Sequence, residues 1–314
     1  MKMMKFRRFE GLVAAPFTAM DKAGNINTDL VPEYYSLLKR NGVAGAFING
    51  STGEGVSLTQ KEKQLHAEKW AECYRTDGSV RVINLVGGTS LRECIENALI
   101  SYDAGISAIA VLAPYYFRPA SEDYLAEFVA GVSESVPEMA VYFYHIPVLT
   151  GVNFPMINFL SKISVMAPNF AGIKYTHEDL MDFLSCLNYE GGAYEMLWGR
   201  DESLLAALAL GARGAVGSTY NYAAPLYNKL IKAYHEGDIA EARKLQQLSI
   251  SMISLLGKYG GMGTGKAFMR YIGLDCGKFR LPVRNMDDKM YNEFAGDVRN
   301  LGIEDLMSVI PRSS

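Results

Sequence analysis

Lys174 is the residue whose position points most directly to chemistry. It follows Ala171, Gly172 and Ile173 and ends an apolar run that we expect to be a buried strand. Burial disfavours an ammonium ion and lowers its pKa. A neutral amine attacks ketones and forms a protonated Schiff base, which accepts electrons from a breaking bond nearby. These residues leave a second interpretation open, in which Lys174 is a surface lysine whose stem lies along the strand end.

Two other segments could place polar groups beside such an amine. The run GSTGE at 50–54 carries the hydroxyls of Ser51 and Thr52, which together with backbone N–H groups could bind a carboxylate or a phosphate. The alternative is an ordinary turn, and the absence of a lysine after the second glycine excludes a P-loop. Tyr144 could transfer a proton if its phenol bonds to a second hydroxyl. Tyr144, Tyr115 and Tyr116 could equally be packing aromatics.

Polar residues also follow the last two predicted strands. Asp201 and Glu202 open a helix, where carboxylates complement the helix dipole, so a structural role is one interpretation. In the other, they accept hydrogen bonds from a polyol, and Ser218 and Thr219 add donors at the same rim. We expect His145 to be structural.

The segment GGMGTGKA at 260–267 nearly matches a nucleotide-binding Walker A motif. Ala267 stands where the motif needs a hydroxyl for Mg²⁺, and helix-like sequence rather than a strand precedes it. We therefore predict a loop between helices without nucleotide binding.

Eight short apolar runs predict the strands that position these residues. They are nearly continuous rather than alternating, which is typical of parallel strands covered on both faces. Helix-like segments lie between them, and two begin with a capping pair, Thr59 with Glu62 and Ser90 with Glu93. The runs are 11–15, 44–48, 81–86, 108–112, 140–144, 170–174, 195–198 and 213–217.

The repeats predict an α/β fold, a (β/α)₈ TIM barrel with a C-terminal helical extension. A doubly wound open sheet is the alternative, because periodicity does not establish closure. We place the catalytic barrel at residues 1–224 and the extension, packed on the barrel, at 225–314, where only helix-like sequence follows. TIM-barrel active sites lie at the carboxyl ends of the strands, which is where the residues above fall.

Composition narrows the class of protein. The chain has 314 residues, 49% of them hydrophobic, and a net charge of −3 without blocks of like charge, which argues against a nucleic-acid or membrane partner. Four dispersed cysteines and four histidines without metal-ligand spacing favour a reduced, metal-free cytoplasmic protein. The N-terminus mimics a signal peptide and residues 139–161 mimic a membrane span. Charged residues or prolines interrupt both. We therefore predict a first strand in the N-terminal segment, and a strand, a loop and a short helix over 139–161.

Five segments taken in order resemble one family. They are GSTGE (50–54), YHIP (144–147), GIKYT (172–176), GRDE (199–202) and GSTYN (217–221). Together they resemble the N-acetylneuraminate lyase branch of the dihydrodipicolinate synthase/N-acetylneuraminate lyase family, from about Gly11 to at least Asn221.

The resemblance implies a class I aldolase on a TIM barrel and a role for each matching residue. Lys174 matches the Schiff-base lysine, and Tyr144 matches the proton-relay tyrosine. Ser51 and Thr52 match the residues that hold the carboxylate of pyruvate. Tyr116 matches a tyrosine that lies near a subunit contact and assists the hydroxyl relay. The positions that match sugar-binding residues are Thr176, Gly199, Asp201, Glu202 and Ser218.

Two departures separate this chain from the synthases of the family. Leu149 stands where they carry an arginine for a second carboxylate, and an apolar side chain cannot replace it. Ser51 stands where they usually carry threonine. Dihydrodipicolinate synthase, another 2-keto-3-deoxy sugar acid aldolase and a non-catalytic pyruvate or sugar-acid sensor remain as alternatives.

The resemblance thus implies reversible cleavage of N-acetylneuraminate to N-acetylmannosamine and pyruvate. It implies no cofactor and no metal, since the Schiff base at Lys174 is the electron sink. It further implies a homotetramer, and we expect small-molecule substrates rather than nucleic acid or membrane as partners.

Overall fold

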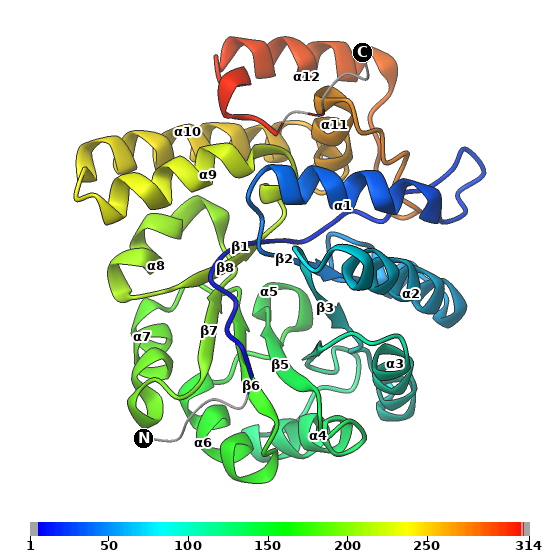
Figure 1. Ribbon diagram of the computed structural model, residues 1–314, viewed down its shortest axis with the longest axis vertical. Coiled ribbons are helices and arrows are strands. Elements are labelled where there is room, and N and C mark those ends of the chain that lie inside the picture. Colours follow the sequence, from blue (N-terminus) through cyan, green and yellow to red (C-terminus); the bar gives the residue numbers. More distant parts are fainter. Residues whose placement is uncertain (1–5, 309, 311–314) are drawn as a thin grey trace.

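The computed structural model describes residues 6–308 and 310, and a closed parallel barrel lies at its centre (Figure 1). Its strands pair in chain order, and β1 pairs with β8 to complete the ring. This closure confirms the TIM-barrel prediction and excludes the open sheet. The strands are β1 (Gly11–Ala14), β2 (Gly45–Ile48), β3 (Arg81–Leu85), β4 (Ala108–Leu112), β5 (Ala140–His145), β6 (Phe170–Tyr175), β7 (Glu195–Trp198) and β8 (Gly214–Gly217).

Helices surround the barrel and continue past it at the C-terminal end (Figure 1). Those associated with the barrel are α1 (Val31–Arg40), α2 (Gln60–Asp77), α3 (Leu91–Asp103), α4 (Glu122–Glu134), α5 (Pro147–Thr150), α6 (Met156–Met166), α7 (Leu180–Asn188), α8 (Leu204–Leu210) and α9 (Tyr220–His235). The extension contains α10 (Ile239–Lys258), α11 (Gly263–Ile272) and α12 (Asp288–Asn300). Short 3₁₀ helices span Thr28–Leu30, Gly55–Ser57, Tyr189–Gly191, Asp201–Ser203 and Glu304–Leu306.

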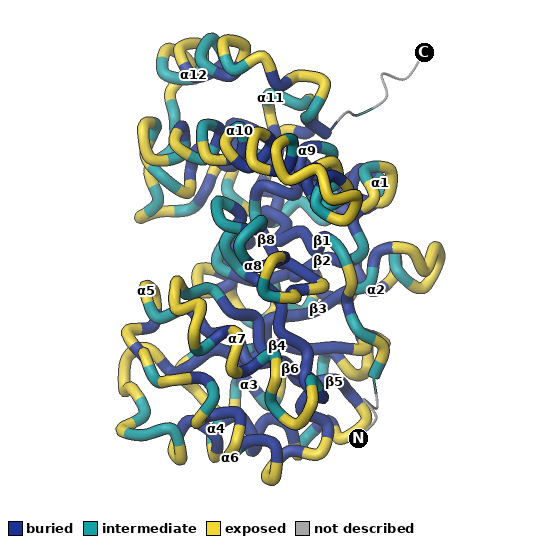
Figure 2. Tube along the Cα trace, turned by 90° about the vertical axis from the view of Figure 1, so that its left-hand side faces the viewer, coloured by how far each residue is buried: buried dark blue, intermediate teal, exposed yellow. Residues whose placement is uncertain are grey.

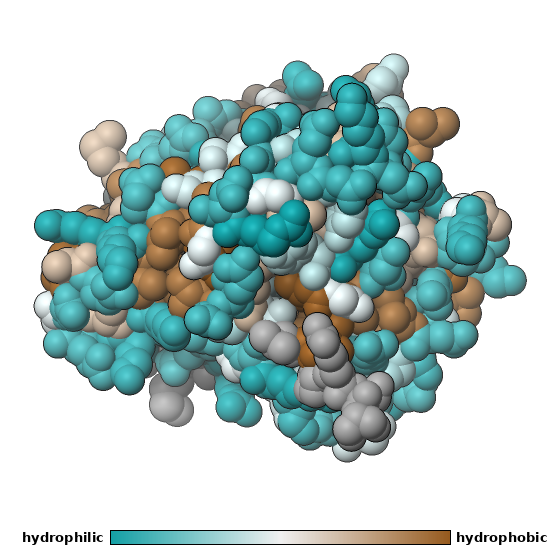
Figure 3. All heavy atoms as spheres, turned by 90° about the horizontal axis from the view of Figure 1, so that it is seen from above, coloured by the Kyte–Doolittle hydropathy of each residue, from teal (hydrophilic) through white to brown (hydrophobic). Residues whose placement is uncertain are grey.

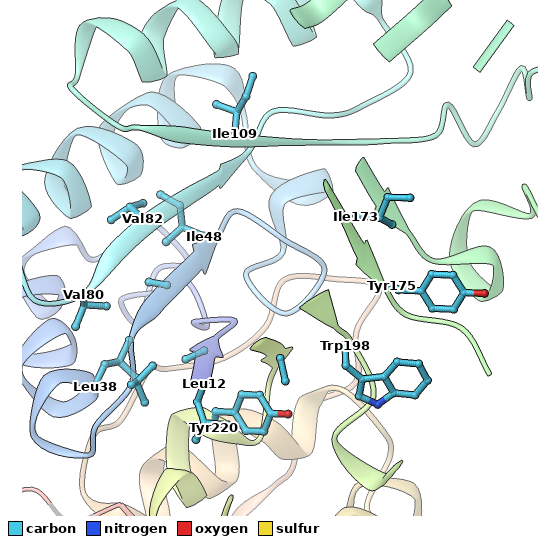
Figure 4. Packing of buried hydrophobic residues seen from close by; sticks show 14 of the residues in the cluster. Leu12, Leu38, Ile48, Val80, Val82, Ile109, Ile173, Tyr175, Trp198 and Tyr220 are labelled. Carbon is cyan, nitrogen blue, oxygen red and sulfur yellow. The ribbon is translucent and has the colours of Figure 1, made fainter. Parts of the chain in front are cut away.

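Alternation along the strands creates two apolar layers. Tyr142 and Tyr144 of β5 belong to the cluster inside the barrel. The outer cluster lies between barrel and helices, and Figure 4 shows Ile48, Val82 and Ile173 of this layer on their strands. Figure 2 shows the strands almost entirely buried and the helices exposed on their outer sides. Lys174, adjacent to Ile173 in the strand, therefore belongs to the inner face.

Local capping explains where two of the predicted helices begin. Thr59 and Glu62 form both halves of a capping box at the start of α2. Ser90 caps α3 by accepting a hydrogen bond from the Glu93 N–H. The Glu93 carboxylate instead pairs with Lys63 at 3.2 Å, so the second half of this box is not formed.

The helical extension forms one end of the molecule and lies beside the barrel, next to α8 and α9 (Figure 1). Helix α9 packs against β1, α8 and α10, so it joins the barrel to the helices that follow. The expected division after residue 224 falls within α9. Seen from above, this end of the molecule is mostly hydrophilic and shows separate apolar patches (Figure 3).

The loop predicted over 260–267 is wrong from Gly263 onward, because α11 begins there. Its glycines are tolerated because other chain segments pass close to them. A Cβ atom on Gly263 would lie 2.2 Å from the Arg284 carbonyl oxygen, and one on Gly265 would lie 2.4 Å from the Phe17 ring. Tertiary packing thus outweighs the low helix propensity of glycine.

The uncharged stretch 139–161 folds as predicted, into β5, a loop with the single-turn α5, and the start of α6. Between residues 6 and 308, none of the helices has both the length and the apolar character needed to cross a bilayer. The first apolar run, at 11–15, forms β1 as predicted.

Candidate active site

Lys174 lies inside the barrel near the carboxyl end of β6, as predicted. Strand pairing places it beside Tyr144 of β5 and Leu197 of β7, and only 4% of its surface is exposed. Its Nζ lies 4.0 Å from the centroid of the Phe47 ring and 3.9 Å from that of Tyr144. Burial lowers the pKa of Lys174 to about 7, although nearby Asp201 opposes this change. A substantial fraction of the amine is therefore neutral at physiological pH.

Tyr144 shares this buried environment. Burial raises the pKa of its phenol to about 12, and hydrogen bonding with the Ser51 and Thr176 hydroxyls opposes the rise in part. Thr176 Oγ1 is buried and has no hydrogen-bond partner of ordinary geometry among the described residues, so it lies near the phenol with its hydrogen-bonding capacity free. The structure thus brings two predicted residues, Ser51 and Thr176, next to the phenol of a third, Tyr144, which is the arrangement that a proton relay requires.

The loop that carries Ser51 and Thr52 is a tight turn between two residues with left-handed backbone. Asn49 and Glu54 both have φ of 56°. The Asn49 side chain donates to Asn84 at 2.8 Å and contacts His66 Nδ1 at 2.8 Å, which anchors this end of the turn. Ser51 and Thr52 are half-buried at the carboxyl end of β2, so their hydroxyls lie at the rim.

Asp201 is buried next to the lysine rather than exposed at the rim. Its Oδ2 accepts hydrogen bonds from the Thr219 N–H at 3.0 Å and the Thr219 hydroxyl at 2.6 Å. A Cβ atom on Gly217 would lie 1.9 Å from Asp201 Oδ1, so only glycine fits beneath this carboxylate. Burial raises the pKa of Asp201 to about 6, and its negative charge favours the protonated form of Lys174.

Glu202 is half-buried and belongs to a charged cluster at the rim. Arg200 donates to Glu202 Oε1 through Nε at 3.0 Å and through Nη2 at 2.8 Å. Its Nη1 lies 2.6 Å from Glu178 Oε1. Arg200 therefore holds Glu202 in one orientation, with a second carboxylate on its other side.

The remaining predicted sugar-binding residues lie at the same rim. Gly199 passes so close to Thr176 that a Cβ atom would lie 1.9 Å from Thr176 Oγ1. Ser218 follows β8 and is half-buried, and its carbonyl accepts a hydrogen bond from the Asn221 side chain at 2.7 Å.

Tyr116 lies apart from these residues within the single chain. It follows β4, 78% of its surface is exposed, and its ring contacts Phe117 at a centroid distance of 5.1 Å. Tyr115 lies in the same loop and is exposed to 37%.

Two contributors to the site were missed from the sequence, and a third has a role other than the one expected. Phe47 supplies an aromatic face to the lysine, but it lies within an apolar run that predicts only a core residue. Arg200 stands within the GRDE segment, yet its pairing with Glu178 depends on the fold. Thr219 was considered as a rim donor, whereas it holds Asp201 inside the barrel.

His145 fits the predicted structural role. Its ring packs 5.1 Å from that of Tyr175, and its Nε2 is buried without a hydrogen-bond partner in the described chain. Burial lowers the pKa of His145 to about 3, so the ring is neutral. Among the residues that the structure describes, no three His, Cys, Asp or Glu side chains gather in a way that could hold a metal ion.

A buried amine of lowered pKa, facing a phenol in a hydroxyl network at the carboxyl ends of the strands, defines the class: a TIM-barrel enzyme equipped for Schiff-base chemistry. The sequence model described as "Dihydrodipicolinate synthetase family" matches residues 8–301. The chain belongs to this family.

Similar proteins cover nearly the whole chain. An N-acetylneuraminate lyase of Gallus gallus is 40% identical over 281 residues, which make up 88% of this chain and 91% of the relative. The N-acetylneuraminate lyase of Homo sapiens is 36% identical over 299 residues, 94% of this chain and 93% of the relative. Among solved structures, Proteus mirabilis N-acetylneuraminate lyase has a TM-score of 0.91 at 33% identity and covers 94% of this chain and 99% of its own.

Proposed function

We propose that this enzyme is a class I aldolase that reversibly cleaves N-acetylneuraminate to N-acetylmannosamine and pyruvate. The observation that carries the proposal is the buried Lys174, with a pKa of about 7 and its Nζ 3.9 Å from the Tyr144 ring centroid. Relatives named N-acetylneuraminate lyase, at 36–40% identity over most of the chain, support the choice of substrate.

In the first step, the hydroxyls of Ser51 and Thr52 anchor the carboxylate of the open-chain keto acid. The neutral Lys174 amine attacks the keto carbon, and the carbinolamine hydroxyl leaves as water with the proton of the Tyr144 phenol. This gives a protonated Schiff base and a Tyr144 phenolate that can accept a proton in the next step. This positive iminium withdraws electrons from the C3–C4 bond, so the route uses neither a metal nor an organic cofactor.

In the second step, Tyr144 takes the proton from the C4 hydroxyl, by way of the hydroxyl network that includes Ser51. The C3–C4 bond breaks, its electrons enter the enamine, and N-acetylmannosamine leaves as the aldehyde. Protonation of the enamine at C3 and hydrolysis of the resulting iminium release pyruvate and restore the amine.

The sugar chain occupies the rim beyond the lysine. Glu202 and Ser218 accept and donate hydrogen bonds to its hydroxyls, and Thr176 holds the oxygen on C4. The missing side chain at Gly199 lets the end of β7 approach Thr176 closely. Asp201 acts from below, because both Thr219 bonds and its burial direct it to the lysine side of the site.

Leu149 favours this substrate over aspartate semialdehyde. The side chain is 56% exposed, in the loop after β5, and cannot pair with a second carboxylate. Assays that compare N-acetylneuraminate, 2-keto-3-deoxygluconate and aspartate semialdehyde would distinguish the lyase from the two other aldolase alternatives, and absence of turnover with all three would support the sensor.

The decisive experiment is trapping with pyruvate and borohydride, followed by peptide mapping by mass spectrometry. We expect a reduced pyruvate adduct on Lys174 and none in the Lys174→Ala variant, which should remain folded by circular dichroism. An adduct on another lysine, or no adduct with the wild-type protein, would refute the mechanism.

We also propose that Tyr116 acts in a homotetramer, at a contact between subunits. Its exposure, together with that of Phe117 (85%) and Val148 (82%), supports an interface on this side of the chain. Size-exclusion chromatography with light scattering would test the assembly. We propose a cytoplasmic location as well, supported by four cysteines that are all free thiols.

A further inference from the structure

The Gly50–Glu54 loop is tied to the helical extension by a buried ion pair. Glu54 Oε1 lies 2.7 Å from Lys266 Nζ, and the two side chains are 3% and 2% exposed. Glu54 Oε2 accepts a hydrogen bond from the Arg280 backbone N–H at 2.8 Å. Both carboxylate oxygens are therefore held by residues more than 200 positions along the chain.

Lys266 is the lysine of the segment that resembles a Walker A motif. Besides Glu54, its Nζ donates to the Lys278 carbonyl at 3.0 Å and lies 4.6 Å from the centroid of the Phe279 ring. The close approaches at Gly263 and Gly265 bring the first turn of α11 against neighbouring segments, which lets Lys266 reach the loop. The glycines and the lysine thus serve packing and pairing within the chain.

Backbone hydrogen bonds connect Glu54 to the other residues of the Gly50–Glu54 loop, which face the substrate in the proposed mechanism. Its backbone N–H donates to the Ser51 carbonyl at 3.2 Å, and the Gly55 N–H donates to the Gly50 carbonyl at 3.1 Å. The Thr18 hydroxyl donates to the Gly53 carbonyl at 2.6 Å. Because Glu54 has φ of 56°, the turn needs surrounding contacts to keep this less favoured conformation.

We propose that Lys266 and Glu54 are positioning residues that set the affinity of the site for the carboxylate of pyruvate, by fixing the Gly50–Glu54 loop from the helical extension. This inference rests on the proposed function, in which Ser51 and Thr52 bind that carboxylate. The extension then contributes to substrate binding by holding the Gly50–Glu54 loop in place, although none of its residues contacts substrate in the proposed mechanism.

The test compares Lys266→Met, Glu54→Gln and the double variant with wild type. The readout is the pyruvate concentration that gives half-maximal borohydride trapping on Lys174, alongside KM and kcat for cleavage of N-acetylneuraminate. We expect Lys266→Met to raise the half-saturating pyruvate concentration at least about tenfold, since small displacements of binding groups have effects of this size. We expect the loss of pyruvate affinity in the double variant to be smaller than the sum of the losses in the two single variants, because the pair acts as a unit.

Arg270→Met is the matched control, because Arg270 lies one turn further along α11 and pairs with Asp288 at 3.4 Å rather than with the loop. It should leave pyruvate trapping unchanged. A lower melting temperature with unchanged half-saturation in both single variants would show a structural role only and overturn the inference. If Lys266→Met does not fold, Glu54→Gln, which keeps the side-chain volume, provides the same measurement. Failure of wild-type protein to trap pyruvate would instead refute the proposed function.

Discussion

At the scale of single residues, one physical cause produces the acid–base character of the site. Burial disfavours charge, so it lowers the pKa of Lys174 and raises that of Tyr144. The amine becomes available as a nucleophile, and the phenol keeps a proton that it can donate to the water that leaves when the Schiff base forms. Both changes come from the same apolar enclosure inside the barrel.

The lowered pKa of Lys174 predicts how Schiff-base formation depends on pH. With a pKa of about 7, about 10% of the amine is neutral at pH 6 and about 90% at pH 8. We expect the initial rate of pyruvate trapping, corrected for borohydride decay, to rise roughly tenfold between these values. A lysine of ordinary pKa would give a rate that keeps rising to pH 10, which would contradict the assignment.

Removal of the Tyr144 hydroxyl should separate the two halves of the reaction. Tyr144→Phe keeps the ring beside Lys174, so pyruvate trapping should persist. Carbon–carbon cleavage should slow by ~10²–10⁴, because the proton acceptor for the C4 hydroxyl is lost. Steady-state kinetics with N-acetylneuraminate measure the second effect, and equal loss in both assays would instead indicate a damaged pocket.

A substitution at Glu202 should weaken binding of the sugar chain and leave binding of pyruvate unchanged. In Glu202→Gln the side chain keeps its shape but loses its charge and part of its pairing with Arg200. We expect KM for N-acetylneuraminate to rise about tenfold, with pyruvate trapping unchanged. Glu178→Gln is the control, since Glu178 pairs with the same arginine from the exposed side. A similar KM increase in both variants would assign the effect to Arg200.

At the scale of elements, the strands and the residues at their ends could be predicted because their causes are local. Continuous apolar runs locate all eight strands to within about one residue at each end, and Lys174 and Tyr144 follow from those ends. The capping box at Thr59 is likewise a local pattern that the structure confirms.

What could not be predicted depends on segments that are distant in sequence. The Glu54–Lys266 pair joins residues 212 positions apart, and neither neighbourhood indicates the other. The same holds for α11, because its glycines disfavour a helix until Phe17 and Arg284 pack against them. Phe47 was missed for a local reason. An aromatic residue within an apolar strand is equally consistent with a core position and with a position that faces the lysine.

The contact between β7 and β6 at the rim predicts a steric test of the site. Gly199→Ala would place a Cβ atom 1.9 Å from Thr176 Oγ1 and 3.0 Å from its Cα, so the hydroxyl beside Tyr144 must move. We expect kcat/KM for N-acetylneuraminate to fall at least about tenfold in a folded protein. Gly257→Ala in α10 is the matched control, because a Cβ there meets nothing within 4 Å. It should leave activity unchanged and stabilise the helix by about 0.5–1 kcal/mol.

At the scale of the whole molecule, the two ends of the barrel have different tasks. The carboxyl ends of the strands carry the site and receive the helical extension. The amino ends are closed by Glu195 of β7, which accepts hydrogen bonds from the Tyr142 hydroxyl and the Phe9 N–H, both at 2.6 Å. This carboxylate therefore joins three segments across the floor of the barrel, where residues serve stability.

The buried floor carboxylate predicts how the stability of the molecule changes with pH. Burial raises the pKa of Glu195 from 4.5 to about 7, so between these values the folded state holds a proton that the unfolded state releases. Its contribution to the free energy of unfolding is therefore greatest below pH 4.5 and is lost as pH rises toward 7. Glu195→Gln removes the buried charge and keeps an acceptor for the Phe9 N–H. We expect it to stabilise the protein by up to about 3 kcal/mol at pH 8, and much less at pH 5.

Urea denaturation at both pH values measures this difference. Glu134→Gln serves as the control, because Glu134 lies exposed on α4, where loss of a charge should change stability by at most about 0.5 kcal/mol. If Glu195→Gln raises the free energy of unfolding by the same amount at pH 5 and pH 8, Glu195 is not the titrating group. A loss at pH 8 would show that the ionised carboxylate is needed to hold Phe9 and Tyr142 at the floor, through its two short hydrogen bonds.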